Sequence, residues 1–116
     1  MRDFHNYIVW TKGHQFALRI YKETKFFPKE ELFGITSQIR RAATSIPFNI
    51  AEGCGRRSDA EFAHFLNIAA GSASEVEEEL LLSYDLGFLN KSCFLELNDA
   101  VNEIKAMLNK LIETLH

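Results

Sequence analysis

The sequence predicts an all-α protein, an antiparallel up-down-up-down four-helix bundle whose second helix is kinked at Pro47. Three observations lead to this fold class. Apolar residues recur every three or four positions along four segments of the 116-residue chain. Short breaks that contain glycine or proline separate these segments. Because each connection is only a few residues long, neighbouring helices are forced to run antiparallel, and residues 1–116 form one domain.

The first helix is predicted over residues 3–24. Its apolar residues fall at helical spacing, and other apolar residues widen this stripe. The main positions are Tyr7, Trp10, Ala17, Leu18 and Tyr21, and the widening ones are Val9, Phe16 and Ile20. The helix should stop before Pro28, because the residue that precedes a proline is pushed out of the α region.

The second helix is predicted to begin near Pro28, since proline is well placed at a first helical position. Glu30 and Glu31 in the first turn suit the positive end of the helix dipole. The apolar positions are Leu32, Ile35, Ile39, Ala42, Ala43, Ile46 and Ile50. This spacing continues through Pro47, which predicts a continuous but kinked helix to about Gly53. The alternative is two helices that are broken at residues 45–47.

A capping box opens the third helix, with Ser58 at the cap and Glu61 three residues later. Gly87, followed by an apolar residue, indicates its end. The fourth helix opens near Asn90 or Ser92 and carries the most regular pattern of the chain, a heptad seam. The seam residues are Phe94, Leu97, Val101, Ile104, Leu108, Leu111 and Leu115.

Composition narrows the class of protein. The two cysteines, Cys54 and Cys93, are too few for a disulfide scaffold and suit a reducing compartment. The N-terminus has no apolar stretch typical of a signal peptide, and no segment approaches 18 apolar residues. We therefore expect a cytoplasmic protein without a membrane partner.

The formal net charge of −3 hides an asymmetry. Residues 1–57 hold ten Lys/Arg and five Asp/Glu, whereas residues 58–116 hold three Lys/Arg and eleven Asp/Glu. The two halves attract each other either between neighbouring helices of one chain or between copies in an oligomer. The acidic total argues against a protein whose whole surface binds nucleic acid.

No pattern supports catalysis, a metal or a cofactor. Two Glu-x-x-His spacings exist, at Glu61/His64 and Glu113/His116, and this spacing occurs in di-iron bundles. The first pair flanks the apolar seam and the second lies at the chain terminus, so neither predicts a metal site. Phosphate-loop, dinucleotide-binding and nucleophile-elbow motifs are all absent from the sequence. We expect a non-enzymatic protein.

A polar line runs beside the apolar stripe of the second helix, and a similar line runs along the third. Their members are Gln38, Arg41, Ser45, Asn49 and Glu52, and Ser72, Glu75 and Glu79. One interpretation is a half-exposed boundary. The other is a buried polar network between helices or subunits, in which a carboxylate, Glu75 or Glu52, holds Arg41.

Arginines occur in two adjacent pairs, Arg40–Arg41 and Arg56–Arg57. The second pair lies between the end of one predicted helix and the capped start of the next. Cations there either balance the helix dipole or contact phosphate, assisted by the glycine loop and a helix N-terminus. The four arginines are therefore candidate nucleic-acid-binding residues.

These segments also carry a family resemblance. The run from Gln38 to Gly53, followed by Gly55-Arg56, resembles the signature of the bacterial four-helix bundle protein family, also called the 23S rRNA intervening-sequence protein family. Other matching pieces are Trp10, Phe27-Pro28, Glu31, Phe33-Gly34, Glu61-Phe62, Phe65-Leu66, Ile68-Ala69, Gly71-Ser72, Glu75 and Leu86-Gly87-Phe88-Leu89. The resemblance covers nearly the whole chain and implies an antiparallel four-helix bundle that assembles as a ring, typically a homopentamer.

Two functions from different classes follow as expectations. The first is a homo-oligomeric accessory protein that binds RNA or DNA, and the second is a protein–protein assembly scaffold without nucleic acid. Similar bundles include the accessory protein of diversity-generating retroelements, a basic pentamer that binds nucleic acid, from which this acidic chain departs. Surplus apolar residues outside the predicted seams, such as Ile8 on the first helix and Ala63, Leu81 and Leu82 on the third, favour a homo-oligomer in either case.

Overall fold

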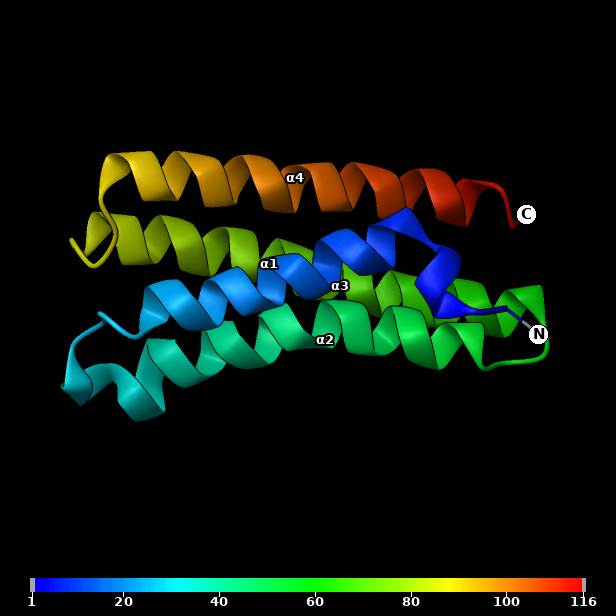
Figure 1. Ribbon diagram of the computed structural model, residues 1–116, viewed down its shortest axis with the longest axis horizontal. Coiled ribbons are helices and arrows are strands. Elements are labelled where there is room, and N and C mark those ends of the chain that lie inside the picture. Colours follow the sequence, from blue (N-terminus) through cyan, green and yellow to red (C-terminus); the bar gives the residue numbers. More distant parts are fainter. Residues whose placement is uncertain (1, 116) are drawn as a thin grey trace.

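Four helices build the protein in a computed structural model that describes residues 2–115. They are α1 (Ile8–Thr24), α2 (Ser37–Cys54), α3 (Asp59–Asp85) and α4 (Lys91–Glu113), and no strand occurs among the described residues. The bundle measures 43 × 23 × 19 Å. In Figure 1 the chain runs from right to left along α1 and α3 and from left to right along α2 and α4. The predicted all-helical class with four main helices is confirmed.

The start of the first helix differs slightly from the prediction. A short 3₁₀ helix, Phe4–Asn6, precedes α1 and is capped by Asp3, whose side chain accepts a hydrogen bond from the backbone N–H of His5 at 3.0 Å. Such local bonds from aspartate compete with the α-helix. The α-helix begins at Ile8.

The start of the second helix was predicted too early. A 3₁₀ helix, Lys29–Glu31, and a π-helical segment, Leu32–Thr36, replace the predicted first turns, and α2 begins only at Ser37. The backbone leaves helical geometry at Gly34 (φ −110°, ψ −122°). Glycine loses more conformational freedom in a helix than any other residue, and here the Gly34 carbonyl accepts both the backbone N–H of Ser37 and, at 3.0 Å, its hydroxyl. The apolar spacing alone did not reveal this interruption.

Pro47 lies inside α2, which continues without interruption to Cys54. The alternative of two helices broken at residues 45–47 is therefore wrong, whereas the kink at Pro47 stays a prediction. Across from the proline, Gly13 of α1 lies so close that an added Cβ would be 3.1 Å from Ile46 Cγ2. The absence of a side chain at Gly13 thus lets α1 and α2 approach each other.

The predicted ends of α3 and the start of α4 are confirmed. The Ser58 hydroxyl accepts the backbone N–H of Glu61 at 3.1 Å. At the other end Gly87 has φ +84°, and the next residue donates its N–H to the carbonyl of Ser83 at 2.9 Å, as in a Schellman motif. The Asn90 side chain caps α4 by accepting the N–H of Cys93 at 2.7 Å.

One hydrophobic core fills the bundle, with contributions from all four helices. Four residues of the predicted α4 seam are buried, namely Leu97, Val101, Ile104 and Leu108, and the three others pack against the core at its ends. Among the four pairs of neighbouring helices, α2 and α3 share the most extensive contact, and α1 and α4 share the smallest. Among residues 2–115, no helix has the length and apolar character needed to cross a membrane.

Candidate interaction surface

The polar line of the second helix faces α3. Ser45 Oγ lies 2.7 Å from Ser72 Oγ of α3, and Asn49 Nδ2 donates to the Ser45 carbonyl at 2.8 Å and to its hydroxyl at 2.9 Å. All three residues are half-buried. The structure therefore joins three of the predicted polar residues in one small hydrogen-bond network at the middle of the α2–α3 contact.

The other members of the line lie at the surface. Gln38, Arg41, Glu52 and Glu75 are exposed, and Glu52 forms an ion pair with Arg56 one turn later, at 3.5 Å. Within residues 2–115 Arg41 has no carboxylate within ion-pair distance. The expected burial of Arg41 against Glu75 or Glu52 is thus not found within a single chain.

Glu79 is instead the buried carboxyl of this surface. Its side chain is only 7% exposed, and its Oε1 atom is buried without a hydrogen-bond partner among the described residues. The pKa of Glu79 is raised to about 8, first because the carboxyl is buried and second because the Glu75 carboxyl lies beside it. The Arg41 guanidinium acts in the opposite direction and lowers this pKa. The spacing of polar residues placed Glu79 in the polar line, but spacing alone does not show that its side chain is buried.

The candidate nucleic-acid-binding arginines are far from forming one patch in the single chain. Arg41 and Arg56 are separated by 15 positions, which is about 22 Å along a helix. Arg40 Nε donates to the hydroxyl of Thr24 at 2.8 Å, and its guanidinium lies 4.8 Å from the centre of the Tyr21 ring. Arg40 is therefore held against α1.

The second arginine pair is also divided between two environments. The guanidinium of Arg56 lies 4.7 Å from the centre of the Phe65 ring and pairs with Glu52. Arg57 is exposed. Neighbouring side chains thus engage Arg40 and Arg56, while Arg41 and Arg57 face solvent.

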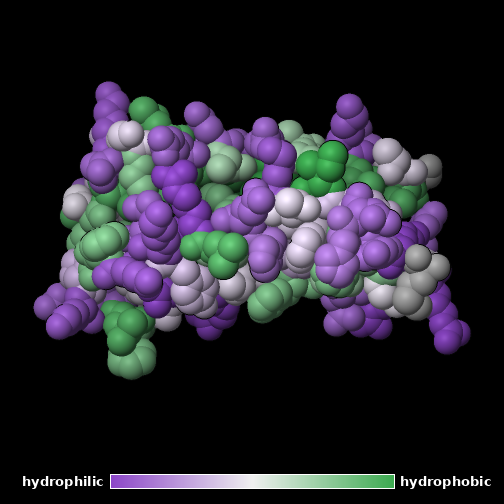
Figure 2. Space-filling model, in the orientation of Figure 1, coloured by the Kyte–Doolittle hydropathy of each residue, from purple (hydrophilic) through white to green (hydrophobic). Residues whose placement is uncertain are grey.

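An aromatic group beside the first arginine pair was not anticipated. A pocket of about 440 Å³ is lined by Tyr21, Phe33, Arg40 and Arg41, together with Leu32, Ser37 and Thr44. Phe33 is 93% exposed, because the π-helical segment turns it outward. In Figure 2 a green, apolar group projects at the lower left, below the start of α2. The interruption at Gly34, which the apolar spacing did not reveal, creates this feature.

Large apolar side chains are exposed on every helix. The surplus predicted on the first helix is partly confirmed, since Ile8, Leu18 and Tyr21 are exposed whereas Val9, Phe16 and Ile20 are buried. On α3, Leu81 and Leu82 are exposed, but Ala63 is buried, which corrects its assignment to the outer surface. The remaining exposed large residues are Phe26, Leu32, Phe33, Phe48, Ile68, Leu86 and Leu95.

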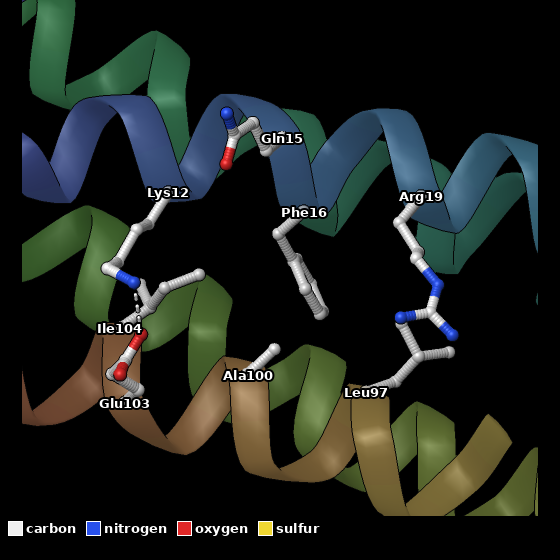
Figure 3. A pocket seen from close by; sticks show the side chains of 8 residues that line it. All are labelled: Lys12, Gln15, Phe16, Arg19, Leu97, Ala100, Glu103 and Ile104. Carbon is white, nitrogen blue, oxygen red and sulfur yellow. Dashed lines mark ion pairs between the residues drawn. The ribbon is translucent and has the colours of Figure 1, made fainter. Parts of the chain in front are cut away.

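A smaller pocket lies between α1 and α4. Figure 3 shows Lys12 and Arg19 reaching from α1 toward α4 on either side of Phe16, and Lys12 pairs with Glu103 at 2.8 Å. The pocket holds about 200 Å³, below the size typical of ligand sites, and apolar side chains form its floor. This ion pair and that between Arg19 and Glu96 connect the two neighbouring helices that share the smallest contact.

Chemically reactive groups are sparse in the described chain. Burial raises the pKa of both thiols, Cys54 and Cys93, so neither is an activated nucleophile. Residues 2–115 contain no group of three or more His, Cys, Asp or Glu side chains close enough to hold a metal ion. Glu61 serves the helix cap, and the Glu113/His116 spacing ends at a residue outside the described range.

Fold and surface together define a helical bundle with exposed apolar side chains and a small polar network between α2 and α3. Residues 5–110 match the family model described as 23S rRNA-intervening sequence protein. The chain belongs to this family.

A solved structure from Bacteroides thetaiotaomicron VPI-5482 is similar to this chain. It is described as a protein with unknown function from the S23 ribosomal protein family. The two share 34% sequence identity and a TM-score of 0.85, and the match covers 91% of this chain and 96% of the other. Comparison with curated proteins gives no match.

Proposed function

We propose that this protein is a non-enzymatic, homo-oligomeric scaffold that acts by binding copies of itself and a partner protein. The observation that carries the proposal is the extent of exposed apolar surface. Five large side chains are at least 60% exposed, namely Ile8, Leu18, Phe26, Phe33 and Phe48. Interaction sites in proteins of this size are built from exposed apolar side chains of this kind.

Charge and family resemblance favour a closed ring. Within the chain, Arg2–Asp59, Lys12–Glu103 and Arg19–Glu96 already join the basic half to the acidic half. Exposed charges outside these pairs, such as Lys22 on α1 and Glu75 on α3, suit a head-to-tail contact in which unlike faces of successive copies meet. Head-to-tail contacts generate rings when the rotation closes. The resemblance to the intervening-sequence protein family favours five subunits, and the composition favours the bacterial cytoplasm as its location.

Light scattering coupled to size exclusion tests the assembly. At micromolar concentration we expect the mass of five copies of the 13.3 kDa chain, and another closed number would keep the scaffold while correcting the pentamer. A mass of 13.3 kDa would contradict the proposal. Pull-down from the native host, with RNA and protein both identified, would then name the partner.

RNA or DNA binding is the second candidate function. The observation that favours it is the pocket in which Tyr21 and Phe33 accompany Arg40 and Arg41, because aromatic rings stack bases and guanidinium groups bind phosphate. The acidic α3 works against this function wherever it faces solvent. A fluorescence-anisotropy titration with structured RNA and duplex DNA at about 50 mM salt decides between the two, since backbone contacts are strongest at low salt. Absence of binding at tens of micromolar protein, about the weak end of non-specific affinity, leaves the scaffold alone.

A further inference from the structure

The helix α3 differs from the other helices in both charge and hydropathy. Its 27 residues include seven carboxylates and no lysine or arginine. Apolar side chains occupy its inner face and also its outer face, where Ile68 and Leu82 are 38% and 44% exposed. Apolar residues on a second face are typical of a helix that is covered on more than one side. The single chain covers only one side of α3.

Gly71 stands at an exposed position in the middle of α3, where glycine is less favourable than alanine. An added Cβ would meet no atom within 4 Å, so nothing in the chain requires a glycine there. Glycine at such a position allows the close approach of another backbone from outside the chain.

Glu79 lies two turns beyond Gly71 and lacks a hydrogen-bond donor. Its Oε1 is buried and unpartnered among residues 2–115, which is costly for a polar group. The charged groups that act on it are Glu75, on α3 itself, and Arg41, on α2. No cation of the described residues lies within ion-pair distance of Glu79, so its charge is left for a donor from another molecule to balance.

The outer face of α1 has the complementary character. Ile8 and Leu18 are 67% and 60% exposed, and Lys22 is exposed one turn after Leu18. The helix carries three cations and one carboxylate, and Lys22 has no ion-pair partner within residues 2–115. An apolar and basic α1 thus matches an apolar and acidic α3.

The heights of these residues along the bundle also match. Gly13 of α1 lies against Ile46, and Ser45 lies against Ser72, so Gly13 and Gly71 are at nearly the same level. The two helices run in the same direction in Figure 1 and rise equally per residue. Counting along both helices from this level brings Lys22 level with Leu80, next to Glu79. In a ring whose axis follows the bundle, residues of equal height meet.

We propose that the outer face of α1 in one copy packs along the outer face of α3 in the next copy, centred on Gly71, and that Lys22 of the first copy pairs with Glu79 of the second. This inference rests on the proposed homo-oligomer and specifies its contact. The pairing requires an ionised Glu79, whose pKa in the single chain is about 8. Near neutral pH, each contact that forms therefore transfers the Glu79 proton to solvent.

Disulfide cross-linking tests the contact directly. The variant Leu18→Cys with Glu75→Cys, in a Cys93→Ser background, places one thiol on each proposed face, while Cys54 stays buried. In one chain these two positions lie on outer faces of helices that do not share a groove. We expect mild oxidation to give a ladder of covalent oligomers on a non-reducing gel. The matched control is Leu18→Cys with Asp99→Cys.

Asp99 is exposed on α4 near the height of Leu18, because the pairs Lys12–Glu103 at 2.8 Å and Arg19–Glu96 at 2.5 Å set residues 12–19 of α1 beside residues 96–103 of α4. The control pair should give no ladder. If the wild-type protein is oligomeric but the Leu18/Glu75 pair yields no more ladder than the control, the α1–α3 contact is wrong while the scaffold stands. If the wild-type protein is monomeric, both proposals fail.

A pH series of sedimentation velocity tests the ion pair separately. Association of the wild-type chain should strengthen between pH 6 and 8, by up to about tenfold per pH unit at each contact, because one proton is released. Glu79→Gln and Lys22→Met should each remove this dependence, whereas Lys110→Met, which changes an exposed lysine on α4, should keep it. A wild-type association constant that is flat over this range, or unchanged pH dependence in Lys22→Met, would overturn the pairing.

Discussion

The neighbouring helices α3 and α4 differ in how far burial within the single chain accounts for their apolar residues. In α4 Leu95 is exposed, but the other large apolar residues follow one seam, whose central members Leu97, Val101, Ile104 and Leu108 are all buried. In α3 the apolar residues exceed what the core accepts, so that Leu81 and Leu82 remain exposed. The pattern of α4 is explained by the single chain, whereas that of α3 points to a surface that another molecule covers.

The largest expected effect belongs to the seam of α4. Ile104→Ala removes a side chain that is 1% exposed, and the lost burial together with the cavity should lower the free energy of unfolding by about 3 kcal/mol. Leu82→Ala on α3 is the matched change, because its side chain is 44% exposed and its loss should cost the single chain much less. Urea denaturation of both variants measures the difference.

If Leu82→Ala lowered the free energy of unfolding of the separated subunit as much as Ile104→Ala does, the proposed difference between α3 and α4 would be wrong. We expect Leu82→Ala to act instead on assembly, by lowering the oligomer mass in light scattering on dilution. Such a division between stability and assembly is the behaviour expected of an interface residue.

The second effect is a pH dependence of stability that comes from Glu79. Between pH 6 and 8 the unfolded chain has already released this proton, while the folded subunit keeps it because its pKa is about 8. The unfolded state therefore binds fewer protons, and stability falls as pH rises, by about 2 kcal/mol over this range. Urea denaturation of a Leu18→Glu variant, which is designed to keep copies apart, measures the slope.

Adding Glu79→Gln to that variant should flatten the slope, because glutamine binds no proton in either state. A slope that persists in the double variant would assign the effect to another group. No decline of stability between pH 6 and 8 in Leu18→Glu itself would show that Glu79 is ionised in the folded subunit.

The features of the fold that could be predicted from the sequence are those that depend on residues close to one another in the chain. The caps at Ser58, Gly87 and Asn90 are confirmed because each is a contact between residues three to five positions apart. The core positions of α4 were equally accessible, since a seven-residue repeat specifies one face. The predicted start of the second helix failed at Gly34, where a single residue interrupts an otherwise regular spacing.

The candidate surface was harder to predict because it depends on which helix faces which. The sequence placed Ser45, Asn49 and Ser72 in polar lines, and the structure joins them. It also suggested that Arg41 would hold Glu75 or Glu52, but the depth of burial selects Glu79 as the carboxyl that lacks a partner. Burial is a property of the packed bundle, so spacing along one helix could not distinguish these glutamates.

A third, smaller effect compares Arg41 with Arg57, which are both exposed. At pH 6, where Glu79 is protonated, Arg41→Ala and Arg57→Ala should have similar, small effects on unfolding. At pH 9 Glu79 is ionised, and loss of the facing Arg41 should cost about 1 kcal/mol more than loss of Arg57, as for a partly exposed ion pair. Urea denaturation at the two pH values tests this, and equal effects at pH 9 would show that Arg41 does not act on Glu79.

The smallest expected effect concerns nucleic acid and applies if the titration detects binding. Each phosphate that the protein no longer neutralises should reduce the slope of log K against log salt by about 0.9 on duplex DNA, or 0.7 on single strands. Because Arg56 is already engaged by Glu52 and Phe65, we expect replacement of both Arg56 and Arg57 by alanine to free one phosphate, the one bound by Arg57. A reduction twice as large would show that Arg56 leaves its partners to bind phosphate, and an unchanged slope would place the binding surface at the Tyr21 and Phe33 pocket, on the opposite half of α2.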